Sequence, residues 1–236
     1  MTPSSKTLRS LGKPTLLLTL AAAGPALGTV LAVGVALPWA DELRAGGATV
    51  WLLLVVAGFL GCGLWVLPTH VLSLLCGWSL GGWAGAAVAL ATASSAAPLG
   101  YVVARRFIGD DVLAFVERYP RGAAVCAAVT RASPGRAALL LGLLRLSPVV
   151  PYGATNVLAA AFAVPWPAFV VGTVVGLAPR VVAVALLGAG LQQLDFTRPG
   201  GAGWLVVGLG ATVAALGFLG WVTQRVLRRA VPVAQA

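Results

Sequence analysis

The chain has 236 residues, of which 59% are hydrophobic and only 9% are charged. An average soluble domain has about 25% charged residues, so this chain has too few polar side chains to cover a globule in water. Soluble enzymes and disordered chains are therefore excluded, and one multi-span membrane domain is expected. The formal net charge is +10. Because the basic residues are spread between apolar runs, we expect them to mark one side of a membrane and not to bind nucleic acid.

Few residues are available for catalysis or metal binding. The chain has one histidine and six carboxylate residues. Its cysteines, Cys62, Cys76 and Cys126, fit no zinc or redox spacing, so we expect them to be small buried side chains. The sequence predicts no enzyme activity, no cofactor and no metal.

The first 67 residues contain a tail and two apolar runs. Residues 1–14 form a basic tail, and an apolar run from about 15 to 40 follows. This run is long enough to cross a bilayer, at roughly 20 residues per crossing, although a cleaved signal peptide is the alternative. With the second run at 49–67, residues 15–67 are predicted to form two transmembrane helices. Most of the tryptophans lie near segment ends, as interfacial tryptophans do: Trp39, Trp51, Trp65, Trp166, Trp204 and Trp221.

The segment 68–107 is predicted to be a short re-entrant piece, 68–83, followed by a helix, 84–107. The apolar part, 71–80, is too short to cross a membrane before a glycine-rich break. Small residues recur there at every fourth position, which places one bare stripe along a helix where another backbone can approach. The stripe has two interpretations, packing within the chain or contact with a second copy. Its members are Gly77, Gly81, Gly85, Ala89, Ala93 and Ala97.

The charged region 108–136 is interpreted as an amphipathic interfacial helix or as a solvated linker. A second re-entrant piece is predicted at 137–155, because Pro148 and Pro151 break any continuous helix there. A helix at 156–191, a transmembrane helix at 204–224 and a basic tail at 225–236 complete the chain.

The same pattern therefore occurs twice. It predicts an all-α polytopic membrane protein, with an inverted repeat of two re-entrant hairpins, each followed by a transmembrane helix, plus flanking transmembrane helices. The distribution of positive charge predicts a cell (cytoplasmic) membrane protein with both tails and the 105–136 region in the cytoplasm. Counting the crossings gives five, which would place the two tails on opposite sides, and an inverted repeat would place the 105–136 region on the outer side. The number of crossings and the side of this region therefore stay open.

Arg145 and Arg180 are cations within apolar segments, and neither has an obvious carboxylate partner. Burying an arginine costs roughly 2.5–3.5 kcal/mol on insertion scales, and a guanidinium of this kind can bind a phosphate or carboxylate through two hydrogen bonds. For Arg180 the alternative is snorkelling or helix capping. His70, the lone histidine, is interpreted either as a proton relay or as a polar residue near water.

Two motifs resemble those of a known family. The residues from Pro68 to Gly77, with Gly100, Tyr101 and Arg105, resemble the first half of the DedA superfamily. The run from Arg145 to Tyr152 resembles the second half. Its Arg-x-x-Pro-x-x-Pro form is similar to the Tvp/SNARE-associated Golgi (VTT-domain) branch, and the resemblance covers roughly residues 50–190.

The resemblance implies two re-entrant hairpins that face a central cavity, and the movement of lipids between leaflets: phospholipid scrambling or the recycling of polyprenyl phosphate. It places a phosphate headgroup at Arg145, with Arg180 as a second cation. The remaining expected substrate-site residues are Pro68, His70, Pro148, Pro151 and Asn156.

Three positions depart from the classical DedA pattern, in which an acidic residue stands at His70, an aspartate near Ala97 and the second-motif arginine at Pro151. Proton coupling through carboxylates is therefore not expected. The leading hypothesis is a transporter or scramblase of a phosphate-bearing lipid. The alternatives are a small-solute or ion carrier and a membrane scaffold, and a homo-oligomer through the small-residue stripe is the expected assembly.

Overall fold

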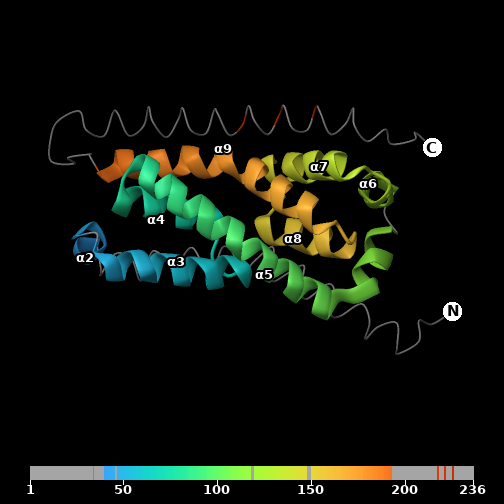
Figure 1. Cartoon of the computed structure of the whole chain (residues 1–236), viewed down its shortest axis with the longest axis horizontal. Coiled ribbons are helices and arrows are strands. Elements are labelled where there is room, and N and C mark those ends of the chain that lie inside the picture. Colours follow the sequence, from blue (N-terminus) through green and yellow to red (C-terminus); the bar gives the residue numbers. More distant parts are fainter. Residues whose placement is uncertain are drawn as a thin grey trace.

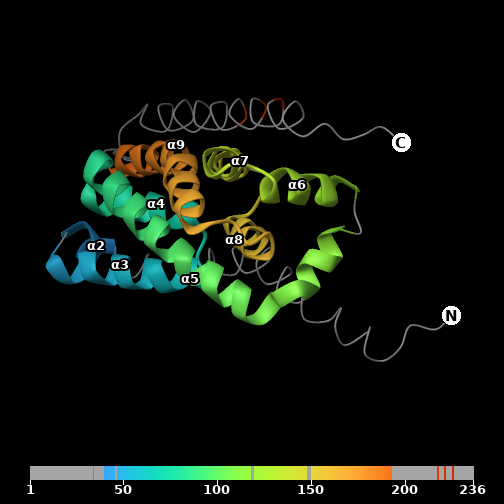
Figure 2. The same cartoon turned by 45° about the vertical axis from the view of Figure 1, so that its right-hand side comes forward.

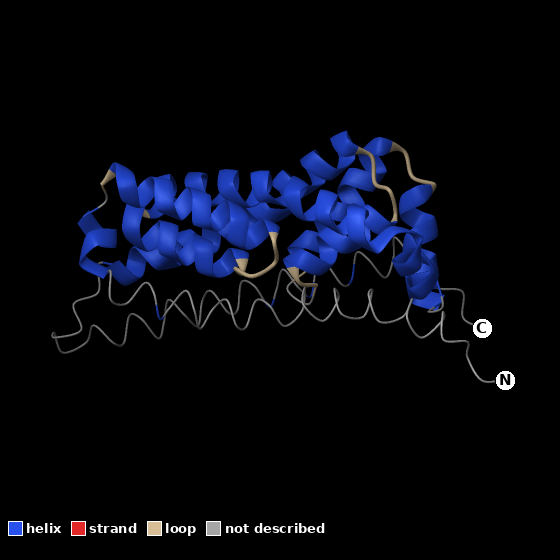
Figure 3. Cartoon of the chain, turned by 90° about the horizontal axis from the view of Figure 1, so that it is seen from below, coloured by secondary structure: helices blue, strands red, loops and turns tan. Residues whose placement is uncertain are grey.

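The structure is a computed structural model that describes residues 40–45, 47–117, 120–147 and 150–192, with single positions at 34, 217, 221 and 225. Every regular element in these ranges is a helix (Figure 3). The predicted N-terminal tail, the transmembrane run at 15–40, the helix at 204–224 and the C-terminal tail lie outside the described ranges.

The described chain begins with the short helix α2 (Ala40–Ala45), and α3 (Ala48–Gly63) follows. The second predicted span, 49–67, is thus a helix only as far as Gly63, and a turn leads from there to Pro68. Most of the large apolar side chains of α3 are exposed, including Leu52 and Leu53. Helix α3 therefore contacts the rest of the chain along a narrow face, mainly on α5.

A glycine divides the first predicted repeat. Helix α4 (Thr69–Leu80) starts after Pro68 and ends at Gly81, whose φ of 82° lies in the left-handed region that glycine adopts without strain. Helix α5 (Gly82–Glu117) follows, with Pro98 inside it. The stripe of small residues therefore does not lie on one helix, as the sequence had predicted, but is shared between α4 and α5.

The chain's own helices cover this stripe. Ala89, Ala93 and Ala97 are fully buried on α5. A Cβ at Gly85 would clash with the backbone of Cys76, and one at Gly77 would clash with the carbonyl of Ala185. The interpretation as packing within the chain accounts for these positions, whereas a homo-oligomer stays a prediction. The prediction for the cysteines is confirmed: Cys62, Cys76 and Cys126 are buried.

The second half contains α6 (Pro120–Thr130), α7 (Pro134–Leu146), α8 (Tyr152–Ala161) and α9 (Trp166–Gln192). The predicted continuous helix at 156–191 is two helices in the structure. The turn between them contains Ala163, at a φ of 50°, and Pro165 lacks the N–H that a continuous helix would need. The predicted charged region is divided between the end of α5, α6 and the start of α7.

Helices α5 and α9 form an antiparallel pair at the centre of the molecule (Figures 1 and 2). Gly82 of α5 faces Leu186 of α9 at one end of the pair. At the other end the ring centroids of Tyr101 and Trp166 lie 4.8 Å apart. Both helices contain a 26-residue stretch that is long and apolar enough to span a membrane, Gly82–Phe107 and Trp166–Leu191, with mean hydropathies of 1.5 and 2.1.

The two halves exchange their short helices. Helix α4, from the first half, packs along α9, and α8, from the second half, packs along α5. Helix α3 lies against α5 and α7 lies against α9. Each short helix follows a proline, and a residue with positive φ comes directly after α4 (Gly81) and two residues after the end of α8 (Ala163). The arrangement brings the starts of α4 and α8 together between the long helices.

Candidate functional site

The two motifs meet at a cavity of about 220 Å³. Pro68, Thr69 and His70 line it from the start of α4, and Pro151 and Tyr152 line it from the start of α8. We name this space the midspan cavity. Its walls contain residues more than 80 positions apart in the sequence, which the exchange of the short helices brings together.

The midspan cavity lies about halfway along the apolar stretches of both long helices. Arg180, which lines it, is 14 residues after Trp166 and 11 before Leu191. Ala93, whose carbonyl accepts a hydrogen bond from the cavity residue Tyr152 at 2.7 Å, is 11 residues after Gly82 and 14 before Phe107. Eleven residues of helix correspond to about 16 Å, which is about half the hydrocarbon thickness of a bilayer.

The N-terminal ends of both short helices face the midspan cavity. Thr69 and His70 are the first residues of α4, and Tyr152 and Gly153 are the first of α8. Neither helix has a side-chain cap, so the first N–H groups of each helix receive no side-chain acceptor. The positive ends of two helix dipoles therefore point to this space, which favours an anion.

Arg180 is the cation at the wall of the midspan cavity. Its side chain is half-buried, and its Nη2 donates a hydrogen bond to Thr69 Oγ1 at 3.1 Å, which ties α9 to the start of α4. Its Nε is buried and has no hydrogen-bond partner. Among the described residues that line the cavity, none is a carboxylate, so the charge of Arg180 is not neutralised there.

Arg145 does not line the midspan cavity but lies behind it, and only 2% of its surface is exposed. Its Nη2 donates to Asn156 Oδ1 at 2.6 Å. Its Cζ lies 5.2 Å from the ring centroid of Tyr152 and 5.5 Å from that of Phe169, within cation–π range. Tyr152 thus contacts Arg145 and also forms part of the cavity wall.

Several buried N–H donors around the cavity have no acceptor: Trp65 Nε1, Arg145 Nε and Nη1, Asn156 Nδ2 and Arg180 Nε. Two of them converge on Gly100. A Cβ at this position would lie 2.7 Å from Asn156 Nδ2 and 2.8 Å from Trp65 Nε1. Because an unsatisfied buried donor costs about 1–3 kcal/mol, such a group of donors favours a ligand with several acceptor oxygens.

The structure brings most of the predicted site residues together. Pro68, His70, Pro151 and Arg180 line the midspan cavity, although the side chain of His70 is largely exposed. Arg145 and Asn156 form one buried pair next to it. Pro148, predicted as a further substrate-site residue, lies outside the described residues.

Sequence reasoning missed several residues of the cavity wall, among them Thr69, Tyr152 and Trp65. Thr69 and Tyr152 occur inside the two motifs, but nothing in their pattern identified them as cavity residues. Trp65 was predicted to mark the membrane interface, and this is wrong for its indole, which is 5% exposed and lines the cavity. The signal that could have identified Trp65 is its position three residues before Pro68, at the end of an apolar run.

The family model of the VTT domain, found in the DedA/Tvp38 family, matches residues 67–190. The chain belongs to this family. The match begins next to Pro68, ends within α9 and includes both motifs and Arg180. The VTT domain and the two apolar helices identify the chain as a membrane protein. No curated protein and no solved structure matches the chain.

Proposed function

We propose that this VTT-domain protein moves a phosphate-bearing lipid across a membrane, with the headgroup passing through the midspan cavity. The observation that carries the proposal is a cavity at mid-depth that has an arginine, two helix N-termini and several unpaired N–H donors, but no carboxylate, among its described surroundings. A phosphate has several acceptor oxygens and a negative charge, so it matches this set of donors. Phospholipids and polyprenyl phosphates both have this chemistry.

The two arginines have different roles in this proposal. Arg180 contacts the phosphate directly, because it lines the cavity. Arg145 holds Tyr152 and Asn156 in place and keeps a positive potential behind the wall. Since its Nε and Nη1 lack partners, a rotation of Tyr152 would open these donors to the headgroup. His70 belongs to the mouth of the cavity in this proposal, as its exposed side chain indicates.

The architecture in this proposal is an inverted pair of re-entrant hairpins. Its support is the repeated order of elements: an apolar helix, a proline, a short helix and a long helix with an internal proline, as in α3–α5 and again in α7–α9. Short helices at mid-depth require neighbours that satisfy their ends. The exchange of α4 and α8 between the halves supplies those neighbours.

A lipid-translocation assay on proteoliposomes tests the proposal. The full-length protein is expected to speed the exchange of a fluorescent phosphatidylglycerol between leaflets. Arg180→Gln should slow this exchange by about tenfold or more, because a charged hydrogen bond is worth about 1.5–3 kcal/mol. Arg145→Ala should have an effect of similar size.

Arg136→Ala is the matched control for Arg145→Ala, since Arg136 is exposed on the same helix, α7. It should leave the exchange rate unchanged. Undiminished exchange in both Arg180→Gln and Arg145→Ala, in protein that unfolds at the wild-type temperature, would overturn the proposal. Competition by small anions, with no lipid exchange, would favour a small-solute carrier instead.

A further inference from the structure

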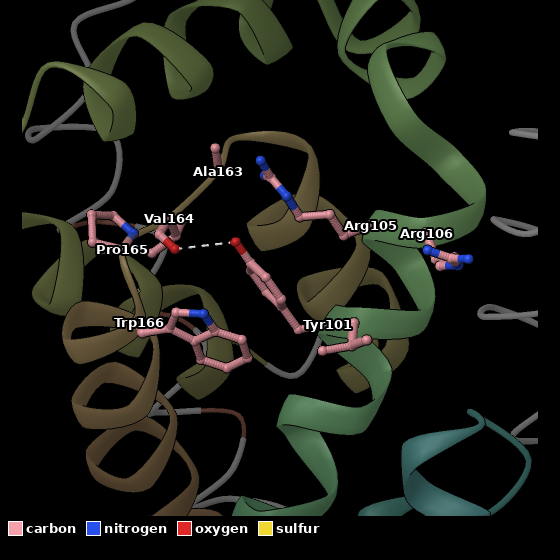
Figure 4. A pocket seen from close by; sticks show the side chains of 8 residues that line it. Tyr101, Arg105, Arg106, Ala163, Val164, Pro165 and Trp166 are labelled. Atoms are coloured by element: carbon pink, nitrogen blue, oxygen red, sulfur yellow. Dashed lines mark hydrogen bonds between the residues drawn. The ribbon is translucent and has the colours of Figure 1, made fainter.

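A second and larger pocket, of about 560 Å³, lies at one end of the α5–α9 pair (Figure 4). Tyr101, Arg105 and Arg106 line it from α5, and the turn at 163–166, which leads into α9, lines it from the other side. We name this space the interfacial pocket. It shares none of its lining residues with the midspan cavity.

The wall of the interfacial pocket is held in a fixed shape. Tyr101 donates a hydrogen bond from its hydroxyl to the carbonyl of Val164 at 3.3 Å, and its ring packs on Trp166 at 4.8 Å and on Phe169 at 4.9 Å. Ala163 has a φ of 50°, which turns the chain around the edge of the pocket. These contacts fix the turn against α5 before any ligand binds.

Arg105 extends across the pocket toward this turn, whereas the end of the Arg106 side chain, which also lines the pocket, is directed away from the turn (Figure 4). Arg105 donates from Nη1 to the carbonyl of Ala160 at 3.3 Å. A guanidinium has five N–H donors in a planar fork, so the other donors of this exposed side chain remain free to face the pocket. No described residue that lines the pocket is a carboxylate.

The depth of the pocket indicates the kind of anion. Arg105 lies two residues before Phe107, where the first apolar span ends, and Trp166 is the first residue of the second span. Trp166 is 48% exposed, and tryptophan prefers the headgroup level of a bilayer. The pocket therefore has a cation and an aromatic ring at the level where lipid phosphates lie.

We propose that the interfacial pocket binds the phosphate headgroup of an anionic membrane lipid, with Arg105 as the contact to the phosphate. The site does not depend on the proposed transport, because a lipid can bind there without crossing the membrane. A line of contacts leads from it to the midspan cavity: Tyr101 packs on Phe169, and Arg145 contacts the rings of both Phe169 and Tyr152. A bound headgroup would therefore lie at the outer end of this line.

Photo-crosslinking tests this proposal. The full-length protein in detergent is mixed with a phosphatidylglycerol that has a photoreactive headgroup, and the labelled peptides are mapped by mass spectrometry. Label is expected on 101–106 and 162–166 and not around Arg131 and Arg136, which are exposed arginines outside the pocket. Arg105→Gln should reduce this label about tenfold, the effect of losing one charged hydrogen bond.

Arg136→Gln is the matched control, because it removes the same charge from an exposed arginine that does not line the pocket. This variant should be labelled on 101–106 and 162–166 as strongly as the wild-type protein. Equal losses in the two variants would show attraction by general surface charge and would overturn the proposal. Suppression of the label by millimolar inorganic phosphate would assign the pocket to a free anion instead, and would also overturn it.

Arg105→Lys keeps the positive charge but not the planar fork. It should retain part of the label, which provides a second variant if Arg105→Gln does not fold. The wild-type protein alone can also contradict the proposal. It would do so if the label were spread evenly over all exposed arginines. Lipid exchange plays no part in these measurements, so their outcome is separate from that of the translocation assay.

Discussion

Arg145 shows how a buried cation is held without a carboxylate partner among the described residues. One amide oxygen, of Asn156, accepts from it, and two aromatic rings lie within cation–π range. It also lies in the last turn of α7, where the negative end of the helix dipole favours a cation. The sequence marked Arg145 as unusual because charge among leucines is costly. The sequence did not reveal that Tyr152 separates it from the cavity, because that contact depends on the break between α7 and α8.

Two substitutions at Tyr152 separate the contribution of its hydroxyl to stability from the contribution of its ring. Tyr152→Phe removes the hydrogen bond to the carbonyl of Ala93 and should lower the free energy of unfolding by about 1 kcal/mol. The ring that contacts Arg145 stays, so lipid exchange should be little changed. Tyr152→Leu also removes the ring and should cost more, by roughly 0.5–2 kcal/mol. Unfolding in mixed micelles measures both, and equal losses in the two variants would contradict the role given to the ring.

At the scale of the helices, glycines determine how closely α4 approaches α9. A Cβ at Gly188 would clash with the carbonyl of Leu74, and one at Gly77 would clash with that of Ala185. The four-residue spacing of small residues predicted a close contact between helices but not the partner. It also could not reveal that Gly81 would end a helix, because the spacing is the same whether a glycine is packed or forms a turn.

Two glycines in the last turns of α9 provide a matched test of this contact. Gly188→Ala must push α4 away from α9, so it should destabilise the protein by about 1–3 kcal/mol, as overpacking does. Gly190→Ala meets no atom within 4 Å, and should stabilise the helix by about 0.4–1 kcal/mol. Thermal unfolding of both variants measures the difference. Equal stabilities would rule out the close approach of α4 and α9.

At the scale of the whole described region, one order of elements occurs twice, and the short helices α4 and α8 each pack on the long helix of the other part. The sequence predicted the repetition, because prolines and apolar runs recur in the same order. The exchange could not be predicted, because α4 is followed directly by α5 and lies against it as well as against α9. The midspan cavity is a product of this exchange. The repeated pattern of interrupted segments predicts a site between the two parts, but it does not show which residues line that site.

Because the two long helices are antiparallel, the end of the apolar stretch of α5 and the start of α9 are expected on one side of the membrane. The end of α9 is expected on the other side. Arg106 and Pro165 border the same pocket, so cysteines placed there should react with an impermeant thiol reagent from one side. A cysteine at Gly190, near the other end of α9, should react only from the opposite side. The native cysteines are buried and give little background. Reaction of positions 106 and 190 from the same side would contradict a crossing by these helices.

The unpaired donors around the midspan cavity also couple ligand binding to the stability of the fold. Without an anion, the protein bears the cost of burying Arg145 with only one neutral acceptor. A phosphate that binds only the folded state offsets this cost and adds about 2.7 kcal/mol of stability at a hundred times its dissociation constant. The melting temperature should therefore rise with the concentration of the correct lipid. A screen of lipids by thermal shift would then identify the lipids that bind the folded protein, without any measurement of transport.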